Sequence, residues 1–335
     1  MQTKTKGEWT MKIGSFMPLR SVWDERIEAL ALEFPEHEFF HGLKPDSPEA
    51  VELDILIAGR LPGHAYLSSS RLKVIFQPFT GINHLPLQSL AERGVRVFNV
   101  HANAFDVAER ALALTLAFYG RVVEFHDDLR QEKWHGFWVR AGAEDNWDSI
   151  AGRTCAILGT GAIGVELAKL LKAFSCPVIG WRRKSGQDVP EGFDKICFDL
   201  DEALGEAEII FVALPATALT EGLLSKERLL AMKGKFLVNV GRGSIVDEEG
   251  LYEALRQGVL KGAAIDTWYQ YPPSGKIGAP SRFPIHTLQN IILSPHVGGA
   301  THQASARAVG ITIDKIRQYL RSGECGTEAD LKAAY

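Results

Sequence analysis

Residues 155–164 read Cys-Ala-Ile-Leu-Gly-Thr-Gly-Ala-Ile-Gly, a short apolar run that leads into three glycines at G-x-G-x-x-G spacing. An amphipathic helix pattern follows at once, with apolar side chains at Ile163, Leu167, Leu170, Leu171 and Phe174. This order predicts a strand, a tight turn and a helix, which is the unit that binds the pyrophosphate of a dinucleotide. A tight strand-to-helix turn that binds nothing is the alternative, because three glycines alone are weak evidence.

Each glycine of this fingerprint has a separate expected role. Gly159 allows the turn, Gly161 lets the backbone approach the phosphates, and Gly164 lets the helix pack on the strand. The helix is expected to begin at Ala162 and Ile163, where free N–H groups and the positive end of the helix dipole favour an anion. We therefore expect these five residues to bind NAD or NADP.

The next predicted strand, residues 177–181, indicates which of the two dinucleotides is bound. In NAD-binding units an acidic residue about 20 residues after the fingerprint binds the ribose hydroxyls. Here Arg182 lies 182 − 164 = 18 residues after Gly164, and Arg183 and Lys184 follow it. A guanidinium can pair with a 2′-phosphate, so the loop predicts a preference for NADP(H), with NAD(H) as the second choice. A basic loop on a solvated surface is the alternative.

The bulk composition excludes several classes of partner. The chain has 335 residues, enough for two domains with full cores. It is 46% hydrophobic and 23% charged, which is typical of a soluble globular protein, and we expect it in the cytoplasm. The formal net charge of −4 gives no sign of binding to nucleic acid or to an anionic membrane. The four cysteines show no metal-ligand spacing, so we expect no metal site.

Strand and helix patterns alternate along the chain, which predicts an α/β fold with parallel, doubly wound sheets. One long helix is expected over 106–130 and a last helix over 302–321. Because the fingerprint begins near the middle of the chain, a separate α/β domain precedes it. Ligands of such sheets bind at the carboxyl ends of strands, so we expect the site between the two domains. The expected strands are 11–14, 53–58, 72–76, 95–98, 155–158, 177–181, 209–214, 236–240, 263–266 and 291–293.

Two of the expected strand ends carry side chains suited to catalysis. Arg242 follows the strand 236–240 between two glycines, where it can clamp a carboxylate and polarise a neighbouring carbonyl. A structural arginine that caps a helix or pairs with Asp247 is the alternative. His296 follows the strand 291–293 in a turn of small residues, where an imidazole can exchange a proton with a substrate. A structural histidine is the alternative.

Four motifs, in their order and spacing, resemble the D-isomer-specific 2-hydroxyacid dehydrogenase family over about residues 72–304. The resemblance implies two Rossmann-like, doubly wound domains: a flavodoxin-like substrate domain formed by 1–101 and 300–335, and an inserted dinucleotide-binding domain, 102–299. It also implies a homodimer built through the cofactor domains. Trp134, Trp138 and Trp147 lie in a polar segment before the fingerprint and either fill the dimer interface or cap the pocket. The motifs are Gly159–Gly164, Leu214–Thr217, Asn239–Gly243 and Ser294–His296.

The resemblance also implies residue roles and an activity. By matching position, Arg242 binds the carboxylate of a 2-oxo acid, His296 is the acid–base group, and Pro215 and Asp266 contact the cofactor, Asp266 at the nicotinamide end. The implied reaction is the NAD(P)-dependent reduction of a small 2-oxo acid, such as glyoxylate or hydroxypyruvate, to the (2R)-hydroxy acid. The alternatives are a member that oxidises formate or another small anion, and a low-turnover dinucleotide sensor.

One position departs from the family pattern. A glutamate usually stands five residues after the aspartate and pairs with the histidine, but here that position is Tyr271, and no acidic residue lies between Asp266 and His296. A carboxylate beside an imidazole favours the imidazolium, whereas a neutral phenol does not. The formate dehydrogenases of this family have glutamine there. We therefore expect Tyr271 to belong to the catalytic group, either hydrogen-bonded to His296 or packed against it.

Candidate substrate anchors lie in the first half of the chain. Arg60 follows the strand 53–58 and faces either the site or solvent. Thr80 and Gly81 follow the strand 72–76, and their backbone N–H groups can cradle a carboxylate, as the family does here. Asn103 begins a further, weaker match to the family.

Overall fold

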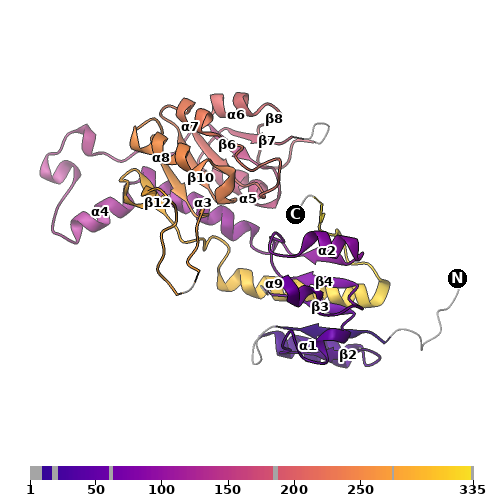
Figure 1. The fold of residues 1–335 in the computed structure, drawn as a ribbon. Coiled ribbons are helices and arrows are strands. Elements are labelled where there is room, and N and C mark those ends of the chain that lie inside the picture. The colour runs from indigo at the N-terminus through magenta and orange to yellow at the C-terminus, as the bar shows by residue number, and fades with distance from the viewer. Residues whose placement is uncertain (1–9, 17–21, 60–62, 184–187, 274, 333–335) are drawn as a thin grey trace. The chain divides into compact units, whose positions relative to one another are not determined.

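The computed structural model describes residues 10–16, 22–59, 63–183, 188–273 and 275–332. The chain forms two compact units, each with its own sheet (Figure 1). Unit 1 comprises Met1–Asn103 and His302–Tyr335, and unit 2 comprises Ala104–Thr301. The prediction of two doubly wound α/β domains is confirmed.

Unit 1 is built on a five-stranded parallel sheet with strand order β2-β1-β3-β4-β5. This 2-1-3-4-5 order is that of flavodoxin-like folds. Its strands are β1 (Lys12–Ser15), β2 (Glu38–Phe40), β3 (Ile55–Ile57), β4 (Val74–Gln77) and β5 (Arg96–Asn99). Its helices are α1 (Val22–Glu33), α2 (Leu87–Glu92) and α9 (His302–Ser322), with short 3-10 turns η1 (Ala50–Glu52) and η2 (Gly63–Leu67).

Both faces of this sheet are apolar because helices cover each of them. Ile55 and Ile57 of β3 pack with residues of α1 and α9 on one face, and Leu56 between them packs with Leu90 of α2 on the other. Successive strand side chains point to opposite faces, so a strand covered on both sides must be apolar throughout. The continuous apolar runs in the sequence therefore identify buried strands.

Unit 2 has a seven-stranded parallel sheet with strand order β12-β11-β10-β9-β6-β7-β8. The order reverses between β6 and β9, as in dinucleotide-binding sheets, where the ligand lies at this switch point. The strands are β6 (Cys155–Leu158), β7 (Val178–Trp181), β8 (Lys195–Cys197), β9 (Ile209–Val212), β10 (Phe236–Asn239), β11 (Gly262–Ile265) and β12 (Ile291–Leu293).

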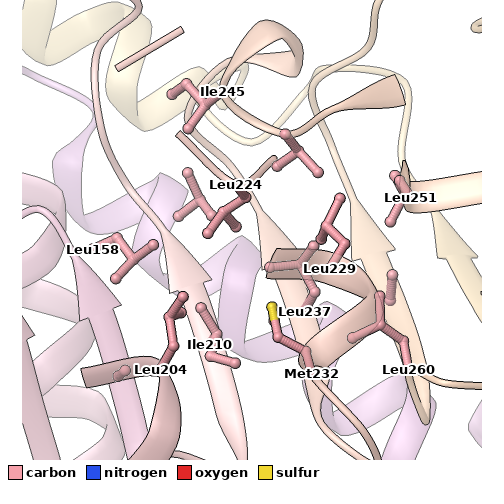
Figure 2. Packing of buried hydrophobic residues seen from close by; sticks show 14 of the residues in the cluster. Leu158, Leu204, Ile210, Leu224, Leu229, Met232, Leu237, Ile245, Leu251 and Leu260 are labelled. Carbon is pink, nitrogen blue, oxygen red and sulfur yellow. The ribbon is translucent and has the colours of Figure 1, made fainter. Parts of the chain in front are cut away.

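The helices of unit 2 form a layer on each face of this sheet. Figure 2 shows one face, where Leu158, Ile210 and Leu237 of the strands meet Leu204, Leu229 and Leu251 of α6, α7 and α8. On the opposite face α3 and α5 pack with their own apolar side chains. The helices are α3 (Ala104–Tyr119), α4 (Val122–Leu129), α5 (Ala162–Lys172), α6 (Leu200–Glu206), α7 (Lys226–Ala231) and α8 (Glu248–Arg256), and the 3-10 turns are η3 (Gly136–Val139), η4 (Ala143–Asp145), η5 (Gly243–Ile245) and η6 (Ile285–Thr287).

Two local expectations were wrong. The helix expected over 106–130 is two helices, because the chain turns at Gly120 and Arg121, and Arg121 has the left-handed φ of 48°. The strands β2 and β8 were missed because each has only three residues and includes a charged one. Within the described ranges, no helix is long and apolar enough to cross a membrane.

Candidate functional site

The candidate residues of unit 2 follow strands at one edge of its sheet. Because all its strands are parallel, their carboxyl ends lie along the same edge. The glycine fingerprint follows β6, Arg182 follows β7, and Pro215 follows β9. Arg242, Asp266 and His296 follow β10, β11 and β12, which are neighbours in the sheet.

The loop after β6 has a shape that fits the pyrophosphate of a dinucleotide. Gly159 has a φ of 109°, and a Cβ there would lie 2.7 Å from the Ala213 carbonyl oxygen. A Cβ on Gly164 would lie 2.1 Å from the Gly159 carbonyl oxygen, so only glycine lets α5 pack this close. A Cβ on Gly161 would meet nothing within 4 Å, so the loop is open on this side. Gly161 is the N-cap of α5 without a side-chain cap, and the helix therefore offers its N–H groups to an anion.

The remaining cofactor candidates stand close to this loop in the fold. Ala162 and Ile163 form the first turn of α5, where Ala162 is exposed and Ile163 half-buried. Pro215 is half-buried, and its carbonyl oxygen accepts a 2.6 Å hydrogen bond from the Thr220 hydroxyl. That bond fixes the loop on the other side of the switch point, between β9 and α7.

The basic loop after β7 contains two described arginines, one hydrogen-bonded to the backbone and one exposed. Arg182 is half-buried, donates from Nη2 to the Asp188 carbonyl oxygen at 3.1 Å, and has its guanidinium carbon 6.0 Å from the centre of the Phe198 ring. Arg183 is exposed. Lys184 lies outside the described residues. The two described guanidinium groups therefore differ in how firmly the fold positions them.

Arg242 stands in a loop that neighbouring strands hold tightly. The buried Asn239 side chain accepts from the Gly241 N–H at 3.1 Å and donates to the Arg242 carbonyl oxygen at 3.0 Å. A Cβ on Gly241 would lie 2.7 Å from the Leu214 carbonyl oxygen, and one on Gly243 would lie 2.3 Å from that of Trp268. The glycines on both sides of Arg242 therefore let its loop pack between the loops that follow β9 and β11.

An ion pair with Asp247 was one structural alternative for Arg242. Asp247 instead caps α8, because its Oδ1 accepts from the Gly250 N–H at 2.6 Å. The Arg242 side chain is half-buried, and its Nη1 donates to the Gly241 carbonyl oxygen at 2.8 Å. The positive charge of Arg242 therefore lies in the loop that follows β10, at the carboxyl-end edge of the sheet.

His296 and Tyr271 are hydrogen-bonded to each other. The Tyr271 hydroxyl lies 2.7 Å from His296 Nδ1, and it also accepts from the Trp268 N–H at 3.1 Å. Of the two expected arrangements for Tyr271, the structure has the hydrogen bond. His296 has a φ of 59°, in the left-handed region that residues other than glycine adopt uncommonly. The contact joins an imidazole to a neutral phenol in the place where the family has a carboxylate.

Asp266 is buried and binds the loop that carries His296. Its Oδ1 accepts from the Ser294 hydroxyl at 2.5 Å and from the Val297 N–H at 3.0 Å, and its Oδ2 accepts from the Gly298 N–H at 3.0 Å. Only 2% of Asp266 is exposed. Asp266 therefore fixes the backbone directly after His296, whatever it contacts in a bound cofactor.

The described substrate anchors belong to unit 1. The Thr80 hydroxyl lies 3.0 Å from Asn103 Oδ1 and 3.2 Å from the Val100 carbonyl oxygen, so the ends of β4 and β5 are joined there. Gly81 is half-buried beside them. The structure thus brings Thr80, Gly81 and Asn103 together. Arg60 lies outside the described residues.

Sequence reasoning missed several residues that shape this site. Asn239 holds the Arg242 loop, Ser294 binds Asp266, and Arg110 of α3 donates to the Ser294 hydroxyl. Asn239 and Ser294 could have been noticed, because Asn239 is the polar last residue of β10 and Ser294 directly follows β12. Arg110 gave no such signal, since it lies in a helix 184 positions from Ser294.

Sequence comparison finds relatives of this chain among known proteins. A family model described as the NAD-binding domain of D-isomer-specific 2-hydroxyacid dehydrogenases matches residues 112–298. A glyoxylate/hydroxypyruvate reductase B from Pectobacterium carotovorum is 32% identical over 76% of this chain and 77% of the relative. A D-3-phosphoglycerate dehydrogenase from Methanocaldococcus jannaschii is 30% identical over 76% of this chain but only 46% of its own length.

A solved structure shows a similar fold. It is an NADPH-dependent glyoxylate/hydroxypyruvate reductase from Sinorhizobium meliloti in complex with citrate. The TM-score is 0.77 at 24% identity, over 96% of this chain and 98% of that one. At this identity the likeness concerns the fold alone.

Proposed function

This chain belongs to the D-isomer-specific 2-hydroxyacid dehydrogenase family of NAD(P)-dependent oxidoreductases, and we propose that it reduces a glyoxylate-like or hydroxypyruvate-like 2-oxo acid with a preference for NADPH. The product is the (2R)-hydroxy acid. The relative from Pectobacterium carotovorum, which carries the name of such a reductase, supports this substrate class.

The observation that carries the proposal is the arrangement of three neighbouring strand ends. The loops after β10 and β12 carry Arg242 and His296. The loop after β11 lies between them: Trp268 packs against Gly243 of the first loop, and Tyr271 is hydrogen-bonded to His296 of the second. A guanidinium that binds a carboxylate and an imidazole that exchanges a proton are the two groups that reduction of a 2-oxo acid requires.

The cofactor is a nicotinamide dinucleotide, and the proposed holding groups are those of the β6 and β7 loops. The open side of Gly161 and the uncapped N-terminus of α5 suit the pyrophosphate. Arg182 and the exposed Arg183 suit a 2′-phosphate, which supports the preference for NADPH. A bound nicotinamide supplies the hydride that the carbonyl carbon accepts.

The protein side chains supply orientation and the proton. Arg242 pairs with the substrate carboxylate and stabilises the negative charge that develops on the carbonyl oxygen. His296 donates a proton to that oxygen, and because Tyr271 binds Nδ1, the donating atom is Nε2. Tyr271 orients the ring, because its uncharged hydroxyl is the hydrogen-bond partner of Nδ1.

A screen of NADPH oxidation tests this proposal. The substrates are glyoxylate, hydroxypyruvate, pyruvate and bulkier 2-oxo acids, each measured with NADPH and with NADH. We expect the highest kcat/KM for glyoxylate or hydroxypyruvate with NADPH. No oxidation above background with any 2-oxo acid and either cofactor contradicts the proposal.

Formate oxidation is a second candidate that one observation favours. Oxidation of formate transfers a hydride and releases CO₂, so it needs no proton from the histidine, and a neutral Tyr271 partner suits it. Incubation with formate and NAD or NADP separates the two candidates. Production of the reduced cofactor from formate, without reduction of any 2-oxo acid, would favour this second candidate.

We also propose that the chain forms a homodimer through the segment after α4. Trp134, Phe137, Trp138 and Trp147 each expose more than half of their surface, which is typical of an interaction site. Analytical ultracentrifugation checks this proposal, with Trp138→Glu expected to weaken association. A purely monomeric wild-type protein at high concentration contradicts it.

A further inference from the structure

Arg110, on the second turn of α3, is connected to the catalytic loop through two buried groups. Its Nε and Nη2 atoms donate to the Ser294 hydroxyl at 3.2 and 3.0 Å, and the same hydroxyl lies 2.5 Å from Asp266 Oδ1. A guanidinium can only donate hydrogen bonds and a carboxylate can only accept them. The direction is therefore fixed: Arg110 donates to Ser294, and Ser294 donates to Asp266.

This chain of hydrogen bonds ends on the backbone of the histidine loop. Asp266 accepts from the N–H groups of Val297 and Gly298, the two residues directly after His296. Gly298 permits this approach, because a Cβ there would lie 2.9 Å from Asp266 Oδ2. The left-handed conformation of His296 persists only if its surroundings hold it, and Asp266 supplies two of the bonds that do so.

The buried carboxylate needs a positive charge nearby. Asp266 is 2% exposed, and the partners described for its two oxygens are a hydroxyl and two backbone N–H groups, all of them uncharged. A buried carboxylate is costly unless it is hydrogen-bonded and compensated by a cation. Arg110 is the cation that the hydrogen bonds of Ser294 connect to Asp266, and the Ser294 hydroxyl lies between the two charges.

The same helix also holds the far end of this loop. Asp106, one turn before Arg110, lies 2.5 Å from the Thr301 hydroxyl. Helix α3 therefore forms hydrogen bonds with both ends of the segment 294–301, through Arg110 to Ser294 and through Asp106 to Thr301. Neither contact involves the surface of His296 itself, so α3 acts on the position of the loop.

We propose that Arg110 is a positioning residue for His296, acting through Ser294 and Asp266 to hold the loop 294–301 in its strained conformation. This inference rests on the proposed function only in so far as His296 is the proton donor. Arg110 touches neither substrate nor cofactor in this role, and its effect is on turnover rather than on dinucleotide affinity.

The test combines hydrogen–deuterium exchange with kinetics. Arg110→Met keeps the length of the side chain but removes its charge and donors, and Arg110→Lys keeps the charge. Arg26→Met, at an exposed arginine of helix α1, is the matched control. We expect Arg110→Met to speed exchange in 294–301 and to lower kcat about 10- to 100-fold, as a small misplacement of a catalytic group does. The Kd for NADPH should change less than about threefold, and Arg110→Lys should recover part of kcat.

Unchanged exchange in 294–301 together with an unchanged kcat in Arg110→Met would overturn the proposal, and so would equal losses in Arg110→Met and Arg26→Met. If Arg110→Met does not fold, the same two measurements are made on Ser294→Ala. This variant removes the hydroxyl between Arg110 and Asp266 and leaves the arginine in place. The exchange measurement needs no substrate. It therefore tests the positioning role even if the wild-type protein reduces no 2-oxo acid and the proposed function fails.

Discussion

Two histidines of unit 2 have hydrogen-bond partners of different kinds. His296, after β12, has a neutral phenol 2.7 Å from Nδ1. His135, between α4 and η3, has Asp145 2.7 Å from Nδ1 and Asp128 2.8 Å from Nε2. Only an imidazolium can donate from both ring nitrogens, so the two carboxylates fix His135 as a cation. The difference separates a histidine that two carboxylates keep protonated from one whose ring is oriented by an uncharged hydroxyl.

The groups around His135 support this assignment. Hydrogen bonds to Asp145 and then Asp128 raise the pKa of His135 above its usual range, and His135 in turn lowers the pKa of Asp145. Lys133 pairs with Asp128, Arg121 lies 3.6 Å from Asp145, and the His135 ring stacks on Phe125. The same Asp145 accepts from the Gly136 N–H at 2.6 Å, at the start of the turn that exposes Phe137 and Trp138. The cation thus organises the exposed aromatic segment.

The largest expected effect is the loss of turnover on removal of the catalytic imidazole. His296→Ala should lower kcat for 2-oxo acid reduction about 10²- to 10⁴-fold, the usual contribution of a positioned general acid. His296→Asn is the better matched variant, since asparagine tolerates the left-handed conformation of this position. NADPH binding, followed by fluorescence, should survive both changes. Near-complete activity in His296→Asn would mean that another group donates the proton.

The next effect concerns the cofactor loop. NADPH should exceed NADH in kcat/KM by about 10- to 150-fold, which corresponds to one charge-assisted contact of roughly 1.5–3 kcal/mol. Arg182→Asp should lower or reverse this preference, and Arg183→Asp is the companion variant, because Arg182 is held by Asp188 and Arg183 is exposed. The measurement is a pair of kcat/KM values for each form. Equal use of the two cofactors by the wild-type protein would remove the basis for the prediction.

The smallest effect is on stability and comes from His135. Because its pKa is raised in the folded state, its contribution is fully present below about pH 6.5 and is lost as the pH rises through the raised pKa. His135→Gln should therefore lower the melting temperature near about pH 6 and converge with the wild type at higher pH. The shift should be small, since the ion pairs lie near the surface. His126→Gln, at an exposed histidine of α4, is the control, and identical shifts in both variants would contradict the role of His135.

The two histidines also differ in how far the sequence predicts them. The position of His296 follows from its place after an apolar strand of a parallel sheet, where strand ends meet. Its left-handed backbone does not, because that depends on Asp266 and on neighbours from α3 far away in the chain. The sequence did not predict the role of His135. Asp128 and Asp145 are close to it in the chain, but the segment between α4 and η4 is irregular, and no hydrophobic periodicity predicts its conformation.

The same contrast holds for the fold. Strands such as β6 and β10 are apolar throughout because helices cover both faces, and the sequence predicts them within a residue or two. The break between α3 and α4 was not predicted, because the apolar pattern runs across Gly120 and Arg121 without interruption. The hydrogen bond between Tyr271 and His296 could be anticipated only as one of two arrangements, since it joins two loops of the sheet edge.

The most direct test of whether His296 is the proton donor with a neutral partner is the pH dependence of kcat/KM. It is measured for the reduction of glyoxylate or hydroxypyruvate by the wild type, Tyr271→Phe and Tyr271→Glu. Reduction needs protonated His296, so wild-type activity should fall as the pH rises through neutrality. Tyr271→Glu places a carboxylate beside the imidazole and should move that fall to higher pH, whereas Tyr271→Phe should move it little. A wild-type profile that stays flat to about pH 9 would contradict this assignment.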